Sequence, residues 1–259
     1  MPDISKQDIH LWLVRECDVN DPVLLETYLT LLSDRELARY ERLRLFQDKK
    51  EFLLTQVLAR TVLAQYLGID DPGELKFERN PHGKPYLPGE NKPQFNLTNS
   101  HGVVALAVTS GIEVGIDIEY LHRKVACLSL ARRYFTPEEA ASFEGLNEEA
   151  IRDRFFDFWT LKEAWLKAYG TGLKTPLNTF GFTIDAENIT IAFTDRLDEK
   201  PDDWSFLQFD MEGDHRISVS VNDSPDTDYS VKFNCGIPLQ GFNATHLEQR
   251  RGKKQEAFR

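Results

Sequence analysis

The order of segments along this chain predicts an α+β fold built as two halves. Alternating apolar residues mark strands at the start, middle and end of the sequence, with a helical region in each of the two gaps. Strands that come in runs, instead of alternating one by one with helices, favour α+β halves over a doubly wound parallel sheet. With 259 residues and 41% apolar side chains, the chain is long enough to bury a sizeable core.

The N-terminal half begins with a strand followed by helices. Residues 8–14 alternate well enough to form the strand. Pro22 opens a first helix that runs to about residue 32, because proline suits the first helical turn. Ser33 and Glu36 have the spacing of a capping box, in which each side chain accepts a hydrogen bond from the other's backbone N–H, and so begin a second helix.

A long third helix and a group of strands complete this half. Apolar residues recur at helical spacing from about residue 49 to residue 67, and Gly68 ends the helix. Proline, glycine and asparagine between residues 71 and 94 predict turns. The strands that follow are expected at residues 95–98, 103–108 and 114–119, the last two joined as a hairpin at Gly111.

The C-terminal half also combines helices with strands. Thr136 and Glu139 form a second capping box, and a long helix over residues 149–169 ends at Gly170. Short alternating segments follow at residues 181–184, 189–193, 205–209, 217–221 and 231–235. The expected domains are residues 1–115 and 116–240, with residues 241–259 as a flexible tail.

Composition argues against several classes of protein. The net charge of −11 disfavours nonspecific nucleic-acid binding, so no nucleic-acid partner is expected. No window approaches about 18 consecutive apolar residues, and the first residues do not resemble a signal peptide, so we expect neither membrane attachment nor export. Three cysteines far apart suit reduced thiols in a cytoplasmic protein.

Two short carboxylate-bearing segments carry the strongest indication of function. In Gly115-Ile116-Asp117-Ile118-Glu119, a strand would point Asp117 and Glu119 to one face. Two carboxylates held close together repel each other unless a cation lies between them, and Mg²⁺ suits such oxygen ligands. An exposed strand edge with two unrelated acids is the simpler interpretation of this segment alone.

The second segment, Trp159 to Lys167, places an acid and a lysine one helical turn apart. Glu163 and Lys167 have the i, i+4 spacing of an ordinary surface ion pair. The aromatic side chains around them, however, make this helix apolar on almost every side, which indicates that it is buried. A buried acid and lysine need partners, and these would be a metal shared with Asp117 and Glu119, and a phosphate.

These segments resemble the paired signature of the 4′-phosphopantetheinyl transferases, specifically the larger Sfp-type class. The resemblance rests on Gly115-x-Asp117-x-Glu119 followed by Trp159-Thr160-x-Lys162-Glu163-Ala164-x-x-Lys167. Three more segments resemble those of the family and stand in the same order: the helix with Ser33, Arg39 and Arg42, residues 80–86 with Gly83-Lys84-Pro85, and residues 95–100. Each segment is weak alone, but in this order they cover most of the chain.

The resemblance implies a fold and a reaction. The chain would be a pseudo-dimer of two similar α+β halves, with coenzyme A and the active site in the cleft between them. It would transfer the 4′-phosphopantetheine group of coenzyme A to a serine of an apo acyl, peptidyl or polyketide carrier protein. The other product would be adenosine 3′,5′-bisphosphate. Because a single chain would supply both halves of the cleft, a monomer is expected.

The resemblance also implies roles for individual residues. Asp117, Glu119 and Glu163 would hold Mg²⁺, with Mn²⁺ as an alternative. Lys167 would contact the pyrophosphate. Chemical reasoning adds a base for the proton of the serine, and Glu163 or Glu119, directly or through a metal-bound water, is the candidate. Coenzyme A would also be bound by Arg39, Lys84, Thr98, Asn99, Ser100 and His101.

One segment departs from the family pattern. Where the family has a histidine in its Phe-Asn-x-Ser-His-Ser segment, this chain has Asn99, and a histidine follows two residues later as His101. Asn99 could take over the phosphate contact as a neutral donor, or His101 could reach in from a shifted turn. His101 could equally be no more than a turn residue.

The carrier contact and the reaction class leave alternatives open. Carrier proteins tend to be acidic, so the basic residues Arg123, Lys124, Arg132 and Arg133 are the candidate contact surface, although a solvated helix face explains them as well.

A Mg²⁺-dependent phosphohydrolase acting on a nucleotide would use the same metal site, but the chain has neither a nucleophilic Asp motif nor a P-loop. The third alternative is a non-enzymatic adaptor that binds a carrier protein or coenzyme A. Loss of Asp117, Glu119 or Glu163 would favour it, but all three acids are present.

Overall fold

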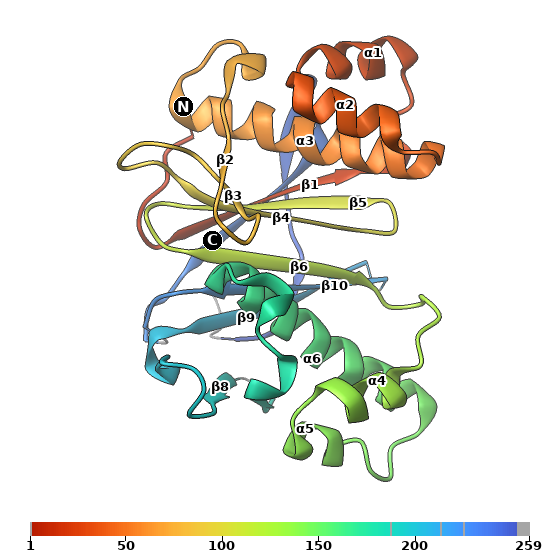
Figure 1. Cartoon of the computed structure of the whole chain (residues 1–259), viewed down its shortest axis with the longest axis vertical. Coiled ribbons are helices and arrows are strands. Elements are labelled where there is room, and N and C mark those ends of the chain that lie inside the picture. The colour runs from red at the N-terminus through yellow and green to blue at the C-terminus, as the bar shows by residue number, and fades with distance from the viewer. Residues whose placement is uncertain (1, 187, 213, 225, 253–259) are drawn as a thin grey trace. The chain divides into compact units, whose positions relative to one another are not determined.

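The computed structural model describes residues 2–186, 188–212, 214–224 and 226–252. The chain divides into two compact units, each with its own sheet and its own long helix (Figure 1). The first unit comprises Met1–Asn80, Pro85–Gly111 and Ser230–His246, and the second comprises Pro81–Lys84, Ile112–Tyr229 and Leu247–Arg259. The predicted α+β fold made of two similar halves is confirmed.

The first unit is a five-stranded sheet with helices packed on one face (Figure 1). The sheet order is β12 (Gly241–Thr245), β11 (Ser230–Ile237), β1 (Asp8–Arg15), β5 (Val103–Thr109) and β4 (Gln94–Ser100). β1 is parallel to β11, and the other pairs are antiparallel. The helices are α1 (Pro22–Thr30), α2 (Asp34–Arg42) and α3 (Phe46–Leu67). Side chains of α3 form the core with those of β1, β4 and β5.

The second unit is a four-stranded antiparallel sheet with α6 (Glu148–Tyr169) on it. The sheet order is β13 (Glu248–Arg251), β9 (Ser205–Met211), β10 (His215–Val221) and β6 (Val114–Tyr120). An aromatic core joins α6 to α4 (Cys127–Tyr134) and to the hairpin of β7 (Phe180–Ile184) and β8 (Ile189–Phe193). α6 is therefore covered on opposite sides, which confirms that it is buried.

Short elements complete the fold. α5 (Pro137–Ala141) precedes α6, and β2 (Glu78–Arg79) pairs with β3 (Pro85–Tyr86). Single 3₁₀ turns lie at Glu16–Asp18, Pro72–Glu74, Gly172–Lys174, Leu177–Thr179 and Pro201–Asp203. Among the described residues, no helix has the length and apolar character needed to cross a membrane.

In the first unit, α3 is anchored by a buried arginine. The guanidinium of Arg60, which is 2% exposed, lies 2.6 Å from Glu36 and donates to the carbonyl oxygen of Leu75 at 2.7 Å. Glu36 is also the third residue of α2 and completes the predicted capping box with Ser33. One ion pair thus joins α2, α3 and the loop that follows α3.

The second unit repeats this anchor. Lys162 is fully buried on α6, lies 2.8 Å from Glu139 and donates to the carbonyl oxygens of Leu177 and Phe180 at 2.8 and 2.7 Å. Glu139 completes the predicted capping box of α5 with Thr136. Both anchors combine a cation of the long helix with the capping glutamate of the preceding helix. The sequence does not reveal this repeat, because the anchoring residues differ and stand far apart.

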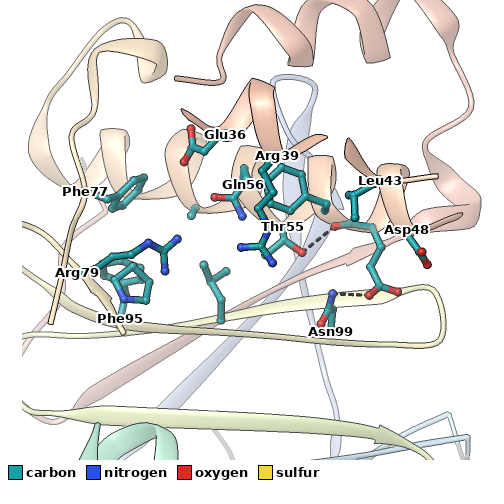
Figure 2. A pocket seen from close by; sticks show the side chains of 15 residues that line it. Glu36, Arg39, Leu43, Asp48, Thr55, Gln56, Phe77, Arg79, Phe95 and Asn99 are labelled. Atoms are coloured by element: carbon teal, nitrogen blue, oxygen red, sulfur yellow. Dashed lines mark hydrogen bonds between the residues drawn. The ribbon is translucent and has the colours of Figure 1, made fainter. Parts of the chain in front are cut away.

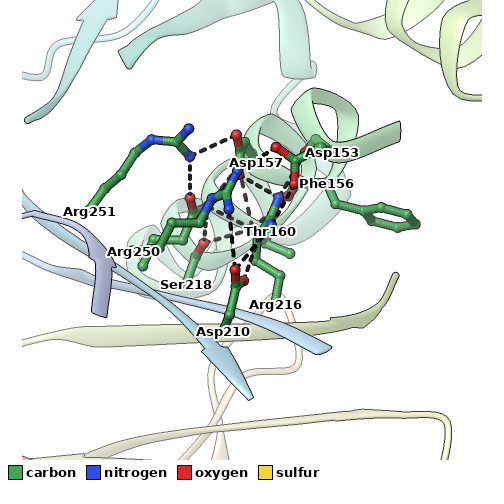
Figure 3. A network of polar contacts seen from close by, with 10 residues as sticks. Asp153, Phe156, Asp157, Thr160, Asp210, Arg216, Ser218, Arg250 and Arg251 are labelled. Atoms are coloured by element: carbon green, nitrogen blue, oxygen red, sulfur yellow. Dashed lines mark hydrogen bonds and ion pairs between the residues drawn. The ribbon is translucent and has the colours of Figure 1, made fainter. Parts of the chain in front are cut away.

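A network of charges around the buried Arg216 fixes α6 to its sheet (Figure 3). Arg216 of β10 is 1% exposed and lies 2.6 Å from Asp157 and 2.7 Å from Asp153, both on α6, and 2.9 Å from Asp210 on β9. The desolvation of such charges is offset only when each charge is paired, as these are.

The expected domain boundaries and tail need correction. Ser230–His246 returns to the first unit because β11 pairs with β1, and the whole of β6 belongs to the second unit because it pairs with β10. Residues 241–245 and 248–251 form β12 and β13, so a flexible tail beginning at residue 241 is wrong there. Arg250 and Arg251 reach the acidic side chains around Arg216, which secures β13 (Figure 3). Residues 253–259 lie outside the described part of the chain.

Candidate active site

The acidic strand segment faces α6. Asp117 and Glu119 alternate with the core residues Ile116 and Ile118, as predicted. On their face of β6, a Cβ atom added to Gly115 would stand 2.0 Å from the carbonyl oxygen of Ala164 and 2.4 Å from a backbone nitrogen of the same helix. Glycine is needed there because the backbones of β6 and α6 touch.

Lys167 of α6 joins the helix to the acidic strand. Its Nζ lies 2.7 Å from Asp117 Oδ1 and donates to the carbonyl oxygen of Ile116 at 3.1 Å. The Lys167 side chain is 28% exposed and that of Asp117 is 8% exposed. The lysine therefore pairs with the strand acid, and not simply with Glu163 one turn before it.

Glu119 is paired with a residue that the sequence assigned to another surface. A guanidinium nitrogen of Arg123 lies 3.0 Å from Glu119 Oε1. Arg123 was expected on the carrier contact surface with Lys124, Arg132 and Arg133, whose side chains are exposed. The i, i+4 spacing of Glu119 and Arg123 did not predict this ion pair. Such spacing brings side chains together on a helix, whereas here a strand ends between the two residues.

Glu163 lies on α6 one turn before Lys167 and has a raised pKa. Burial is the main cause, and the charge of Asp117 raises the pKa further, whereas Lys167 and Arg123 lower it. The result is a pKa of about 7 against an ordinary value of 4.5. The pKa of Glu163 is thus close to neutral pH, and its carboxyl is near enough to Asp117 to respond to the charge of that residue.

The three predicted metal ligands are brought to one helix–strand interface without forming a ready site. Among the described residues, no group of three or more His, Cys, Asp or Glu side chains is placed to hold a metal ion. Asp117 and Glu119 instead hold the ammonium of Lys167 and the guanidinium of Arg123. Two cations of the chain itself, Lys167 and Arg123, therefore neutralise these two carboxylates.

The first unit contains a cavity of about 400 Å³ beside α3 (Figure 2). Arg39 of α2 and Arg79 of β2 line it, together with aromatic rings, and Arg39 lies over the ring of Phe52 with its Cζ 5.0 Å from the centroid. Burial lowers the pKa of Arg79, and the charges of Arg35 and Arg39 lower it further. The positive charge on this side of the cavity favours an anion as ligand there. The lining residues are Glu36, Arg39, Leu43, Asp48, Glu51, Phe52, Thr55, Gln56, Ala59, Phe77, Arg79, Pro85, Phe95, Leu97 and Asn99.

Asn99 also lines this cavity, so the structure brings it together with Arg39. Its amide nitrogen donates to Glu51 Oε1 of α3 at 2.5 Å (Figure 2). Burial raises the pKa of Glu51, and Glu16 and Asp48 raise it further. The cavity therefore has an acidic side as well as a basic one.

The other predicted residues of this segment lie elsewhere. Thr98 is buried, and along β4 it and Ser100 alternate with Asn99, which places them on the opposite face of the strand. His101 is exposed in the turn between β4 and β5, with a φ of 44°, followed by Gly102 with a φ of 82°. His101 is not among the lining residues of the cavity.

Lys84 belongs to the second unit. Its Nζ lies 2.6 Å from Glu113 and donates to the carbonyl oxygen of Ala168, near the C-terminal end of α6, at 3.1 Å. A cation suits the partial negative charge of a helix C-terminus. The structure thus places Lys84 beside α6, and a contact with coenzyme A stays a prediction.

Sequence reasoning missed two residues. Arg79 lines the cavity with Arg39, and its only sequence signal was its place directly before the segment that resembles the family. Lys162 was part of the signature without a role, and only its three polar contacts identify it as an anchor.

Comparison with known proteins gives the same family for both parts of the chain. Residues 113–220 match the 4′-phosphopantetheinyl transferase superfamily, and residues 22–111 match the N-terminal part of a 4′-phosphopantetheinyl transferase. These two ranges contain both the β6–α6 interface and the cavity-lining residues of α2 and α3.

Named relatives agree with the family models. A Nostoc protein, 4′-phosphopantetheinyl transferase HetI, is 37% identical over 173 residues, which cover 66% of this chain and 72% of the relative. 4′-phosphopantetheinyl transferase Sfp from Bacillus subtilis is 29% identical over 155 residues, 60% of this chain and 67% of that protein. A solved holo-(acyl-carrier-protein) synthase from Bacillus anthracis, in complex with CoA (3′,5′-ADP), covers 44% of this chain and 97% of its own, at 19% identity and a TM-score of 0.34.

The family is therefore established by long matches at substantial identity, and the signature residues of β6 and α6 lie inside the matched range. This chain belongs to the 4′-phosphopantetheinyl transferase superfamily and is of its Sfp type.

Proposed function

We propose that this chain transfers the 4′-phosphopantetheine group of coenzyme A to a serine of an apo carrier protein, using Asp117, Glu119, Glu163 and Lys167. The transfer follows from the family. The observation that supports these residues is the β6–α6 interface, where Lys167 lies 2.7 Å from Asp117 and both Asp117 and Lys167 act on the pKa of Glu163. The serine oxygen forms a bond to phosphorus while the bond to the leaving bisphosphate breaks.

The carboxylates of Asp117, Glu119 and Glu163 fit a hard divalent cation. All three offer oxygen donors, which Mg²⁺ and Mn²⁺ prefer. Burial is the main cause of the raised pKa of Glu163, and the nearby charge of Asp117 raises it further, as expected for two acids that lie close together. Lys167 and Arg123 supply part of that charge. When bound, the cation would neutralise charge that develops on the transferred phosphate.

The chain's own residues then have definite tasks. Lys167, with 28% of its side chain exposed, would attract the pyrophosphate of coenzyme A while it stays on Asp117. Glu163 is our choice for the group that accepts the serine proton, because Asp117 and Glu119 are held in ion pairs by Lys167 and Arg123. Glu119 is the alternative base, but in the structure it pairs with Arg123.

The cavity of the first unit is our candidate for the nucleotide side of coenzyme A. Arg39 and Arg79 offer positive charge to phosphate, and Phe52, Phe77 and Phe95 offer apolar surface. Asn99 lines the same cavity as a neutral donor, which favours Asn99 over His101 for the contact that the family assigns to histidine.

A transfer assay tests the reaction and the choice of Glu163. The chain would be incubated with coenzyme A, Mg²⁺ and a small panel of apo carriers, and the carrier mass measured. Gain of one phosphopantetheine group is expected, whereas coenzyme A cleavage with an unchanged carrier would indicate a phosphohydrolase. Glu163→Gln should abolish transfer, and Glu149→Gln, on the same helix and exposed, should not. Near-normal turnover by the Glu163 variant would exclude it as base and ligand.

A binding experiment tests the cavity. Arg39→Gln should weaken coenzyme A binding about tenfold or more, because a charged contact to phosphate is lost. Arg42→Gln removes the same charge from the same helix outside the cavity lining and is the matched control. Equal effects of the two substitutions would place the nucleotide elsewhere.

The carrier contact surface is proposed at the exposed basic residues Lys124, Arg132 and Arg133. Arg132 and Arg133 lie in the last turn of α4. Reversing both charges should raise the Michaelis constant for an acidic carrier and leave that for coenzyme A unchanged. An unchanged Michaelis constant for the carrier would remove α4 from the contact surface.

A further inference from the structure

Arg123 lies on a carboxylate that the proposed function assigns to the metal. Its terminal nitrogen is 3.0 Å from Glu119 Oε1, and 40% of the Arg123 side chain is exposed against 10% for Glu119. Arg152 of α6 fixes the turn after β6 by donating to the carbonyl oxygens of Leu121 and Arg123, at 3.1 and 2.8 Å. The backbone of Arg123 is therefore held, while its guanidinium reaches back to Glu119 on the strand.

The two cations of this interface are held unequally. Lys167 has a contact of 2.7 Å with Asp117 Oδ1 and another of 3.1 Å with a backbone carbonyl oxygen. Arg123 has its ion pair and lies over the ring of Phe156, with Cζ 5.7 Å from the centroid, and its Nε is buried with no hydrogen-bond partner among the described residues. A guanidinium can hold a carboxylate with two parallel hydrogen bonds, which this geometry does not use. Arg123 is thus the cation that a competing charge displaces more easily.

We propose that Arg123 is a built-in competitor of the divalent cation. It neutralises Glu119 when no metal is bound, and it leaves this carboxylate when the metal binds. The proposal rests on the metal set given above. A divalent cation brings twice the charge to the same oxygen, and the displaced guanidinium gains water for an Nε that is buried without a hydrogen-bond partner in the part of the chain that the structure describes. The Glu119–Arg123 contact therefore lowers the metal affinity of the chain.

Metal titration of the full chain without substrates tests the proposal. Calorimetry with MgCl₂, and with MnCl₂ as a second probe, would compare Arg123→Gln with Lys124→Gln. Lys124→Gln removes the same charge from the adjacent, exposed position. We expect Arg123→Gln to bind metal about three- to tenfold more tightly than the unsubstituted chain, and Lys124→Gln to change affinity less than about twofold.

Glu119→Gln separates this inference from the proposed function. If Glu119→Gln binds metal as tightly as the unsubstituted chain, Glu119 is not a ligand, and both claims fail. If it binds more weakly while Arg123→Gln binds no more tightly than Lys124→Gln, the ligand set stands and the competition is refuted.

Nuclear magnetic resonance gives a direct second measurement. The Nε–Hε signal that is missing in Arg123→Gln belongs to Arg123, and it should shift when Mg²⁺ is added to the unsubstituted chain. A signal that stays unchanged at saturating Mg²⁺ would show that the guanidinium never leaves Glu119.

Discussion

The long helices α3 and α6 share a length and an anchor but differ in what lies beside them. Both have 22 residues, and both end at a glycine in the left-handed conformation, Gly68 and Gly170. Each buries a cation, Arg60 or Lys162, at the same distance from that glycine. Beside α3, however, there is a cavity of about 400 Å³, whereas α6 touches the backbone of its neighbouring strand.

The residues that follow the two anchors show what this difference means. Arg60 precedes Thr61, whose hydroxyl donates to the carbonyl oxygen of Val57 in the same helix at 2.7 Å. Lys162 precedes Glu163, whose carboxyl responds to Asp117. At equivalent positions of the two long helices, the first unit therefore has the neutral Thr61, which is hydrogen-bonded within its own helix, and the second unit has the ionisable Glu163. The open helix face suits binding, and the tightly packed one suits the precise placement of charge.

The largest expected effect separates the two anchors. Lys162→Met leaves Glu139, whose side chain is 2% exposed, as an unpaired buried acid and should destabilise the chain by about 3–5 kcal/mol. Arg60→Met should cost less, because the Glu36 side chain is 13% exposed and can be hydrated. Urea unfolding of both variants measures the difference. Lys162→Met with Glu139→Gln should recover part of the loss, and equal costs for the two anchors would contradict this order.

Gly115→Ala tests the close contact of α6. A methyl group 2.0 Å from a backbone oxygen forces β6 and α6 apart, so a loss of about 3 kcal/mol or more is expected. Gly111→Ala is the control, since its Cβ meets open space and only the φ of 78° is unfavourable, at about 1 kcal/mol. If the two variants unfold at the same urea concentration, the helix and strand do not touch as described.

The pH dependence of stability should distinguish Glu163 from its neutral counterpart Thr61. Because the folded-state pKa of Glu163 is about 7 and its ordinary value is 4.5, the folded chain keeps a proton that the unfolded chain loses between these values. The contribution of Glu163 to the free energy of unfolding is therefore full below pH 4.5 and falls as the pH rises through 7. Glu163→Gln should remove this fall.

The size of this effect is on the order of 1–3 kcal/mol. It would be measured as the difference in unfolding free energy between Glu163→Gln and the unsubstituted chain, at pH 4 and at pH 8, with a chelator present. Thr61→Val, measured in the same way, should show no change of this difference with pH. A pH-independent difference for the Glu163 variant would mean that its carboxyl is not perturbed.

The smallest expected effect concerns the acidic side of the cavity. Glu51→Gln removes a negative charge from a cavity that we assign to phosphate, and it keeps a group able to accept from Asn99. Coenzyme A should bind about two- to fivefold more tightly. Glu41→Gln, exposed on α2 and outside the lining, is the control. Weaker binding after Glu51→Gln would indicate that this acid contacts the ligand directly.

Local signals in the sequence predicted most of the elements. Both capping boxes and the two glycines that end the long helices are where the sequence placed them, because these features depend on neighbouring residues. The start of α3 was placed too late, since Leu45 and Phe46 are exposed and their first turn has no apolar periodicity. The last strands were missed as a tail. β13 is held by β9, which is distant in sequence, and β12 forms a hairpin with β11, which is itself held by the distant strand β1.

The sequence by itself determined the α+β class, the family and the residues that carry the signature, since residue types at fixed spacing specify strand faces and helix turns. Only the tertiary structure decided the partners of those residues. In the structure, Lys167 pairs with Asp117 and Arg123 pairs with Glu119. Arg39 and Asn99 line the same cavity, and Lys84 lies at the C-terminal end of α6. Charge pairing acts through space, and most of these partners lie far apart in the chain, so the spacing of residues in the sequence does not identify them.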